Sequence, residues 1–187
     1  MRMKTVLTVA VLGVAVAATP AVAGEISKAQ TRRSQIDQFA DDTLNKLFQE
    51  SQKSRRLYDR AVGYAIFDSA KFSLGLSGGG GVGVAIDKRG GTKTYMKMGT
   101  AGVGFGLGGQ VYQIVFLFED EQTFRKFIDE GWEAGATANA VAGRGGANAQ
   151  SSFVNGLAVY QLTEAGLMLQ ADISGTKYWK YRKLNQY

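Results

Sequence analysis

The chain has 187 residues and carries 22 Lys and Arg against 16 Asp and Glu, which gives a net charge of +6. This length suits one domain with a proper core. The chain contains neither Cys nor His. Their absence excludes disulfides, thiolate nucleophiles, Ser-His-Asp triads, and the zinc or haem sites that need sulfur or imidazole. Hydrophobic residues make up 45% of the chain, so a folded domain is expected. These features favour a binding protein over an enzyme.

The first 23 residues have the pattern of an export signal. Arg2 and Lys4 precede an uncharged stretch over 5–18, shorter than the roughly 20 residues of a membrane-spanning helix. Residues 21–23, Ala-Val-Ala, fit the small-x-small rule and predict cleavage near Ala23. An uncleaved anchor is the alternative. A lipoprotein is not expected because no Cys follows, and the predicted location is the periplasm or the exterior of the cell.

Residues 24–50 are predicted to form an N-terminal amphipathic helix. Apolar side chains recur at helical spacing from about Ala29 to Glu50, and Ser27 with Gln30 has the capping-box pattern. Residues 51–187 are predicted to form the β-rich remainder of the domain. That part begins with a basic segment over 51–60 and a short apolar strand over 64–67.

Glycine dominates the next stretch, since 14 of the 25 glycines lie between Gly75 and Gly109. Large apolar residues alternate with them at a period of two, which predicts strands on either side of a turn at 87–91. The return strand is expected over 92–98. Repeated glycine inside strands predicts close approach of another backbone or tight curvature.

The remaining segments complete an α+β prediction. Residues 110–118 are predicted as a buried central strand, and Glu119-Asp120-Glu121 opens a second short helix. The further elements expected in chain order are a strand over 132–141, a loop over 143–149, a hairpin of 153–162 with 167–173, and a basic and aromatic tail over 177–183. The predicted architecture is a long N-terminal amphipathic helix packed on a curved, mostly antiparallel, Gly-rich β-sheet with one inserted short helix.

Three sequence patterns match known catalytic or nucleotide-binding motifs but lack the residues or elements that those motifs need. Gly75-Leu76-Ser77-Gly78-Gly79 matches the nucleophile elbow, but the chain has no His and strand-like sequence follows. The dinucleotide patterns at 78–83 and 104–109 lack the helix that would hold a pyrophosphate. We therefore predict no catalytic residues, no cofactor and no metal.

The basic residues gather at 53–60 and at 177–183. Nucleic acid is not the expected partner, because an exported protein rarely meets it and no RNA-binding signature is present. Anionic lipid headgroups fit better, since Lys and Arg are attracted to such membranes and Tyr and Trp prefer the interface.

A family resemblance rests on an ordered set of motifs. They are AVGYAIF at 61–67, KFSLGLSGGGGVG at 71–83, GVGFGLGGQ at 102–110, GLAVY at 156–160 and GLM at 166–168. Over about residues 51–181 the sequence resembles the SYLF lipid-binding domain. The resemblance implies a lipid-binding protein without enzyme activity, whose eukaryotic relatives bind phosphoinositides and other acidic phospholipids and in some cases actin.

Two departures place the chain with the bacterial, exported branch of that family. Asp68 stands where the family usually has Pro, and Tyr95-Met96-Lys97-Met98 replaces the aromatic-Ser-x-Pro stretch of the eukaryotic branch. Both departures argue against phosphoinositide selectivity and actin binding. The expected partner is an anionic phospholipid or membrane surface, and the alternative function is an envelope scaffold that self-associates or docks to another envelope protein.

The predicted lipid contacts are Lys53, Arg55, Arg56, Arg60, Lys71, Phe72, Tyr178, Trp179 and Lys180. The segment at 53–60 is favoured over the tail, because it joins the helix to the first strand and is held by both. The tail is terminal, where chains fray.

Overall fold

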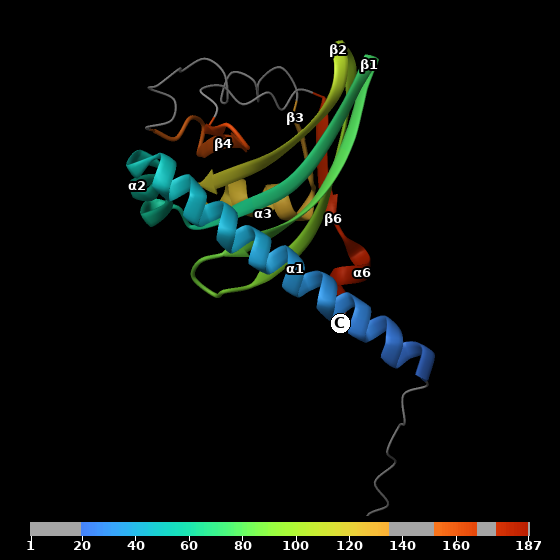
Figure 1. The fold of residues 1–187 in the computed structure, drawn as a ribbon. Helices are drawn as coiled ribbons and strands as arrows, with labels where there is room; N and C mark the ends of the chain where they lie inside the picture. Colours follow the sequence, from blue (N-terminus) through green and yellow to red (C-terminus); the bar gives the residue numbers. More distant parts are fainter. Residues whose placement is uncertain (1–19, 135–151, 168–174, 187) are drawn as a thin grey trace, which may run out of the picture.

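The computed structural model describes residues 20–134, 152–167 and 175–186. Its elements in chain order are α1 (Pro20–Glu50), α2 (Gln52–Arg60), β1 (Gly63–Asp87), β2 (Lys93–Phe118), α3 (Glu121–Asp129), β3 (Trp132–Ala134), β4 (Leu157–Thr163), β5 (Gly166–Leu167), β6 (Thr176–Lys180) and α6 (Arg182–Asn185) (Figure 1). A long N-terminal helix lies against an antiparallel sheet, and α3 is inserted between strands. The predicted α+β class is confirmed. No helix in these three ranges is long and apolar enough to cross a membrane.

The sheet is organised around β2. One edge of β2 pairs with β1 in a long antiparallel hairpin, from Gly63 opposite Phe118 to Ile86 opposite Lys93. The other edge pairs with β6 over residues 96–100 and with β4 over 113–118. Strand β3 then extends the sheet from β6, and β5 extends it from β4. The prediction of a central strand at 110–118 is confirmed.

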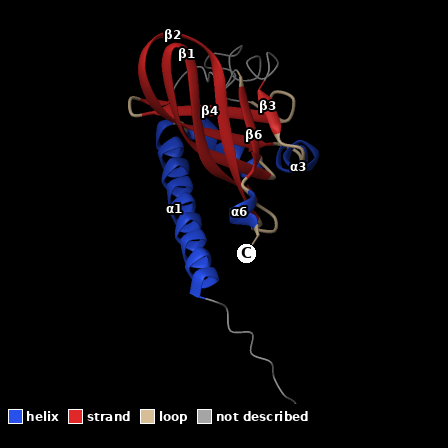
Figure 2. Ribbon diagram, turned by 90° about the vertical axis from the view of Figure 1, so that its right-hand side faces the viewer, coloured by secondary structure: helices blue, strands red, loops and turns tan. Residues whose placement is uncertain are grey.

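The two faces of the sheet carry different cores, and α1 and α3 lie on opposite sides of it (Figure 2). Even-numbered residues of β1 face α1, where Ile66 and Val84 are buried with Leu44 and Leu47 of the helix. Odd-numbered residues face α3, where Phe67 packs in an aromatic cluster. The aromatic members of that cluster are Phe67, Tyr112, Phe116, Phe118, Phe124, Phe127, Trp132 and Tyr178. Strand alternation therefore separates a helix-facing side from an aromatic side.

Glycine lets the β1–β2 hairpin fold over itself. A Cβ atom on Gly81 would overlap the carbonyl oxygen of Asp68, and one on Gly83 would overlap the carbonyl oxygen of Ile66. The edge of the first half of β1 thus lies against the glycines of its second half, so this edge is covered by the chain itself. The predicted close approach of backbones is confirmed. The nucleophile-elbow pattern at 75–79 lies inside β1, with no helix after it.

Several local predictions are corrected at the N-terminal end. Helix α1 begins at Pro20, well before residue 29. The capping-box prediction is wrong because Ser27 lies inside the helix, where its carbonyl accepts a hydrogen bond from the Thr31 hydroxyl. The basic segment at 51–60 folds as helix α2, capped by the Ser51 side chain, which accepts from the Ser54 N–H. The short strand at 64–67 is the start of the 25-residue β1.

The C-terminal predictions are confirmed in part. The turn at 87–91 and the inserted helix occur where expected, whereas the return strand predicted over 92–98 is the first part of β2, which continues to Phe118. The last hairpin is present as β4 paired with β5, although β4 starts at Leu157 rather than at 153. The tail is not a free end, because β6 is hydrogen-bonded between β2 and β3. The expected elements over 135–141, 143–149 and 168–173 fall outside the described residues.

Candidate functional site

Helix α1 covers only part of the sheet face that it packs against. Farther along the hairpin the same face carries Phe72, whose side chain is 59% exposed, and Val111, which is 55% exposed. The register places both on one side, since Phe72 is opposite Gly109 and Ala70 is opposite Val111. This uncovered part, together with the neighbouring cations of α6, is called the exposed sheet face. Its members are Asp68, Ala70, Phe72, Val82, Lys97, Val111, Trp179, Arg182 and Lys183.

Trp179 joins this face from β6. It lies opposite Lys97 in the β2–β6 register, and its ring packs over Gly99, where an added Cβ would come within 3.1 Å of the indole. The ring remains 41% exposed. Phe72, Val111 and Trp179 are the large hydrophobic side chains that are exposed in the described part of the chain, and all three lie on one face.

Two cavities on this face meet at Lys97. The first has a volume of about 500 Å³ and is lined by Asp68, Val82 and Val111 together with Arg32 of α1. The second, of about 440 Å³, is lined by Lys97 and Trp179 together with Lys180, Arg182 and Lys183. The Lys97 ammonium lies 4.1 Å from the centre of the Tyr181 ring, a cation–π distance that holds the charge at the surface.

The exposed sheet face is predominantly positive. In the described residues, no hydrogen bond or ion pair joins Arg182 or Lys183 to a carboxylate, whereas Lys180 forms a 2.8 Å ion pair with Asp129. The one acid of the face is Asp68. Burial raises the pKa of Asp68 above its ordinary value, and its hydrogen bond to the Ser69 backbone and the charge of Arg32 act in the opposite direction.

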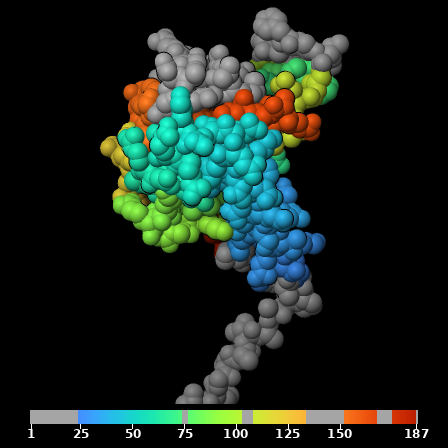
Figure 3. Space-filling view, turned by 60° about the vertical axis from the view of Figure 1, so that its left-hand side comes forward, coloured from blue at the N-terminus to red at the C-terminus, as the bar shows by residue number. Residues whose placement is uncertain are grey.

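The favoured basic segment at 53–60 lies elsewhere. Helix α2 sits beside the C-terminal end of α1 (Figure 3), whereas α6 contacts α1 through a 2.8 Å hydrogen bond from Arg33 Nε to the Leu184 carbonyl. Those two points of α1 are about 25 Å apart along the helix axis, at 1.5 Å per residue. The structure therefore does not bring the two predicted basic clusters together.

Half of the basic residues on α2 already have acidic partners. Arg55 pairs with Asp59 at 3.6 Å, and Arg60 pairs with Glu119 at 3.1 Å. The Arg55 guanidinium also lies 4.7 Å from the centre of the Phe48 ring. Lys53 and Arg56 are exposed. All four side chains are on the surface, so lipid contact at α2 stays a prediction.

Tyr178 is a correction, because its side chain does not reach the surface. It is fully buried in the aromatic cluster, with its ring 4.8 Å from that of Phe67 and 5.1 Å from that of Phe116. Among the described residues, its hydroxyl has no hydrogen-bond partner. In β6 the side chains alternate, so Trp179 faces outward while Tyr178 faces the core. Lys71 is half-buried and points to the opposite side of β1 from Phe72.

Three residues of this region were not predicted from the sequence. Val111 belongs to an apolar run that reads as buried throughout, and only the limited length of α1 leaves it exposed. Lys97 was seen as a departure from a motif rather than as a contact. Arg32 lies in α1, 65 residues before Lys97 in the sequence. Pairing the residue alternation of 93–98 with that of the tail over 176–180 would have placed Lys97 on the same side of the sheet as Trp179.

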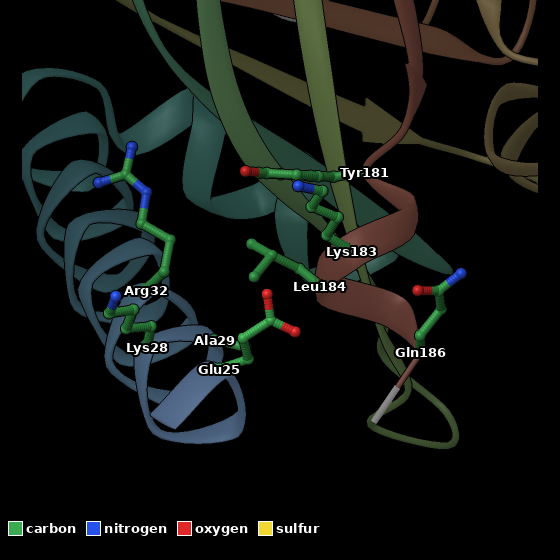
Figure 4. Close-up of a pocket in the computed structure, with 8 residues that line it drawn as sticks. All are labelled: Glu25, Lys28, Ala29, Arg32, Tyr181, Lys183, Leu184 and Gln186. Carbon is green, nitrogen blue, oxygen red and sulfur yellow. The ribbon is translucent and has the colours of Figure 1, made fainter. Parts of the chain in front are cut away.

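A third cavity separates the N-terminal part of α1 from α6. It has a volume of about 370 Å³ and is lined by Glu25, Lys28, Ala29, Arg32, Tyr181, Lys183, Leu184 and Gln186 (Figure 4). Its α6 wall is fixed to β2, since the Asn185 side chain bonds both the Tyr95 N–H at 2.9 Å and the Tyr95 carbonyl at 2.7 Å. We call this cavity the α1–α6 cleft.

Metal binding finds no support in the geometry. Within the ranges that the structure describes, no three acidic side chains come together in a way that would hold a metal ion.

Comparison with known proteins points to one family. Residues 99–187 match the family model described as "Ysc84: Las17-binding protein actin regulator", which represents the SYLF domain. The chain is also 45% identical over 158 residues to "Beta cell expansion factor A" of Aeromonas veronii. That match covers 84% of this chain and 60% of the relative, so the chain spans about three-fifths of the relative's length. Residues 99–187 therefore match the SYLF family model, in agreement with the family resemblance predicted from the sequence.

Proposed function

We propose that this protein binds anionic phospholipid membranes peripherally, and that the exposed sheet face is the surface that docks. The observation that carries the proposal is the gathering of Phe72, Val111 and Trp179 on one face together with cations. An apolar patch bordered by positive charge is typical of a membrane-docking surface.

The chemistry of the face fits the membrane interface. Insertion of the Phe72 ring among acyl chains would contribute about 1.5–3 kcal/mol if it became fully buried. Trp179 is a residue type that prefers the headgroup level. Lys97, Arg182 and Lys183 would each contribute about 1 kcal/mol at an anionic surface. Together these terms support reversible binding without a membrane-spanning segment.

The proposal is for a non-enzymatic, exported protein. The match to the SYLF family model supports a binding role, and the family description names actin regulation for its members. Because the first 23 residues have the pattern of an export signal, we infer that the protein reaches the periplasm or the exterior, where actin is not an expected partner. Residues 1–19 lie outside the described part of the structure.

Vesicle flotation tests the docking surface. The mature protein, residues 24–187, is mixed with vesicles of phosphatidylcholine alone or with added phosphatidylglycerol, and the floated fraction is measured. We expect binding only to the anionic vesicles, and a loss of about tenfold or more for Phe72→Ala. The matched control is Phe153→Ala, because Phe153 is a half-buried aromatic whose ring lies beside Arg60, away from this face.

Two results would overturn the proposal. Equal flotation with neutral and anionic vesicles would show that the cations do not direct binding. Unchanged binding by Phe72→Ala would show that the exposed sheet face is not the docking surface. Light scattering on the same samples would reveal an oligomer that ignores vesicles, which is the outcome expected of a scaffold.

A further inference from the structure

We propose that the α1–α6 cleft is a specific binding site for a phosphate ester that carries an ammonium or hydroxyl group, such as phosphoethanolamine. The proposal deepens the proposed function, because such an ester is also a phospholipid headgroup. The cleft is a place distinct from the apolar part of the exposed sheet face, since Phe72 and Val111 do not line it.

One end of the cleft is suited to a phosphate. Lys28 and Arg32 line it from α1, and Lys183 lines it from α6. In Figure 4 the Tyr181 hydroxyl and the Lys183 ammonium point from the α6 side toward α1, where Arg32 lies across from them. Cationic donors from two separate elements match the several acceptor oxygens of a phosphate group.

The other polar feature of the cleft is an acid. The Glu25 carboxylate points into the gap below Tyr181 and Lys183, toward Leu184 (Figure 4). A carboxylate accepts hydrogen bonds and repels a second anionic group. A ligand that is negative at one end and bears an ammonium or hydroxyl donor at the other therefore complements the cleft better than a plain anion does.

Hydrogen bonds to the backbone of its α6 wall hold the cleft in place. Arg33, on a different side of α1 from Arg32, donates to the Leu184 carbonyl at 2.8 Å. The Tyr181 N–H donates to the Tyr95 carbonyl at 2.9 Å, and Asn185 clamps the same residue of β2. These bonds fix α6 against both α1 and the sheet before any ligand arrives, which reduces the entropy that binding must overcome. The volume of about 370 Å³ suits a headgroup-sized molecule.

Calorimetric titration of the mature protein, residues 24–187, at low salt tests the site with three soluble probes. These are O-phosphoethanolamine, inorganic phosphate and ethanolamine. We expect O-phosphoethanolamine to bind about tenfold more tightly than phosphate, and ethanolamine not to bind. Arg32→Gln should weaken the binding of both phosphate compounds by about tenfold, because Arg32 is the α1 cation that lies across from Tyr181 and Lys183. Glu25→Gln should leave phosphate binding intact and remove the preference. The control is Lys126→Gln, on α3, which lies on the opposite side of the sheet.

A second arm identifies the source of the ligand. Flotation is compared between phosphatidylcholine vesicles with and without phosphatidylethanolamine, because the methylated choline ammonium has no N–H to donate to Glu25. A gain with phosphatidylethanolamine that Glu25→Gln abolishes supports a lipid headgroup. Soluble binding without that gain supports a free phosphate ester.

The two proposals fail separately. No binding of O-phosphoethanolamine by the folded chain, or a preference that survives in Glu25→Gln, overturns the cleft site. Anionic-vesicle binding that depends on Phe72 would remain in either case. Conversely, if Phe72→Ala left vesicle binding unchanged, the docking proposal would fail, but the titration with O-phosphoethanolamine would not be affected.

Discussion

Removal of three positive charges from the exposed sheet face should weaken membrane binding far more than removal of three charges from α2. The first variant combines Lys97→Gln, Arg182→Gln and Lys183→Gln, and the second combines Lys53→Gln, Arg55→Gln and Arg56→Gln. Both lower the net charge by three. The comparison therefore holds the overall electrostatic attraction constant and changes only where the charge is lost.

The magnitude follows from the positions of the charges. At about 1 kcal/mol for each cation at an anionic surface, the exposed-face variant should lose about 3 kcal/mol, or roughly a hundredfold in affinity. On α2, Arg55 is already paired with Asp59, and the helix lies beside the other end of α1. The α2 variant should lose only the few-fold effect of its lower net charge.

Flotation with phosphatidylglycerol vesicles at increasing salt is the assay. The difference between the two variants should shrink as the Debye length falls from about 10 Å at 0.1 M salt to about 3 Å at 1 M. Thermal unfolding checks that both variants are folded, since the surface contacts removed contribute at most about 1 kcal/mol each. If the α2 variant loses as much binding as the other, the cations of the exposed face do not direct docking and the sequence-based preference for 53–60 stands.

Three further predictions concern stability. Because burial raises the pKa of Asp68, ionisation of this carboxyl destabilises the folded state as pH rises through that pKa. Asp68→Asn should therefore increase the free energy of unfolding at pH 7. In urea titrations this gain should disappear toward pH 4. A constant difference across that range would contradict this assignment. Gly83→Ala should cost about 1–3 kcal/mol because its Cβ would overlap the Ile66 carbonyl and lie 2.6 Å from the Phe67 ring, whereas Gly80→Ala, whose Cβ would lie 3.4 Å from its nearest neighbour, should cost much less. Equal losses of stability for the two variants in urea titrations would contradict the close approach of backbones at Gly83. Asp120→Ala should lower stability by about 1 kcal/mol, because the Asp120 side chain caps α3 by accepting from the Thr123 N–H at 2.8 Å; Asp129→Ala, which removes only an exposed ion pair, is the control for thermal unfolding.

The sequence predicts the elements of this fold better than it predicts their lengths. Alternation of glycine with Val, Phe and Leu correctly indicates strands, because period two is a local property. This alternation does not show that β1 continues unbroken through Lys71 and Gly79. The strand can continue there because it curves, and its curvature depends on which backbones pack against each other. The start of α1 was placed too late because the capping pattern at Ser27 is local, whereas the helix continues upstream of it.

Only part of the candidate site can be predicted from the sequence, because local patterns do not show which strands pair. Composition identified Trp179 and the tail cations, and the family motifs identified Phe72. Whether each side chain faces outward depends on pairing across β2. Tyr178 and Trp179 are neighbours of similar character, yet the first is in the core and the second is on the surface. The contribution of Arg32 and Lys97 arises from long-range contacts that no local pattern reveals.

The pairing of β6 with β2 has a consequence for the order in which the domain folds. The β1–β2 hairpin closes on contacts local to residues 63–118, but residues 96–100 of β2 find their β6 partner about 80 residues later in the sequence. Until residues 176–180 have paired, that edge of β2 presents unpaired N–H and carbonyl groups beside an incomplete aromatic core. An exposed strand edge next to apolar surface is a template for aggregation. A chain truncated before β6 should therefore aggregate on refolding from urea, whereas the chain that includes β6 should not.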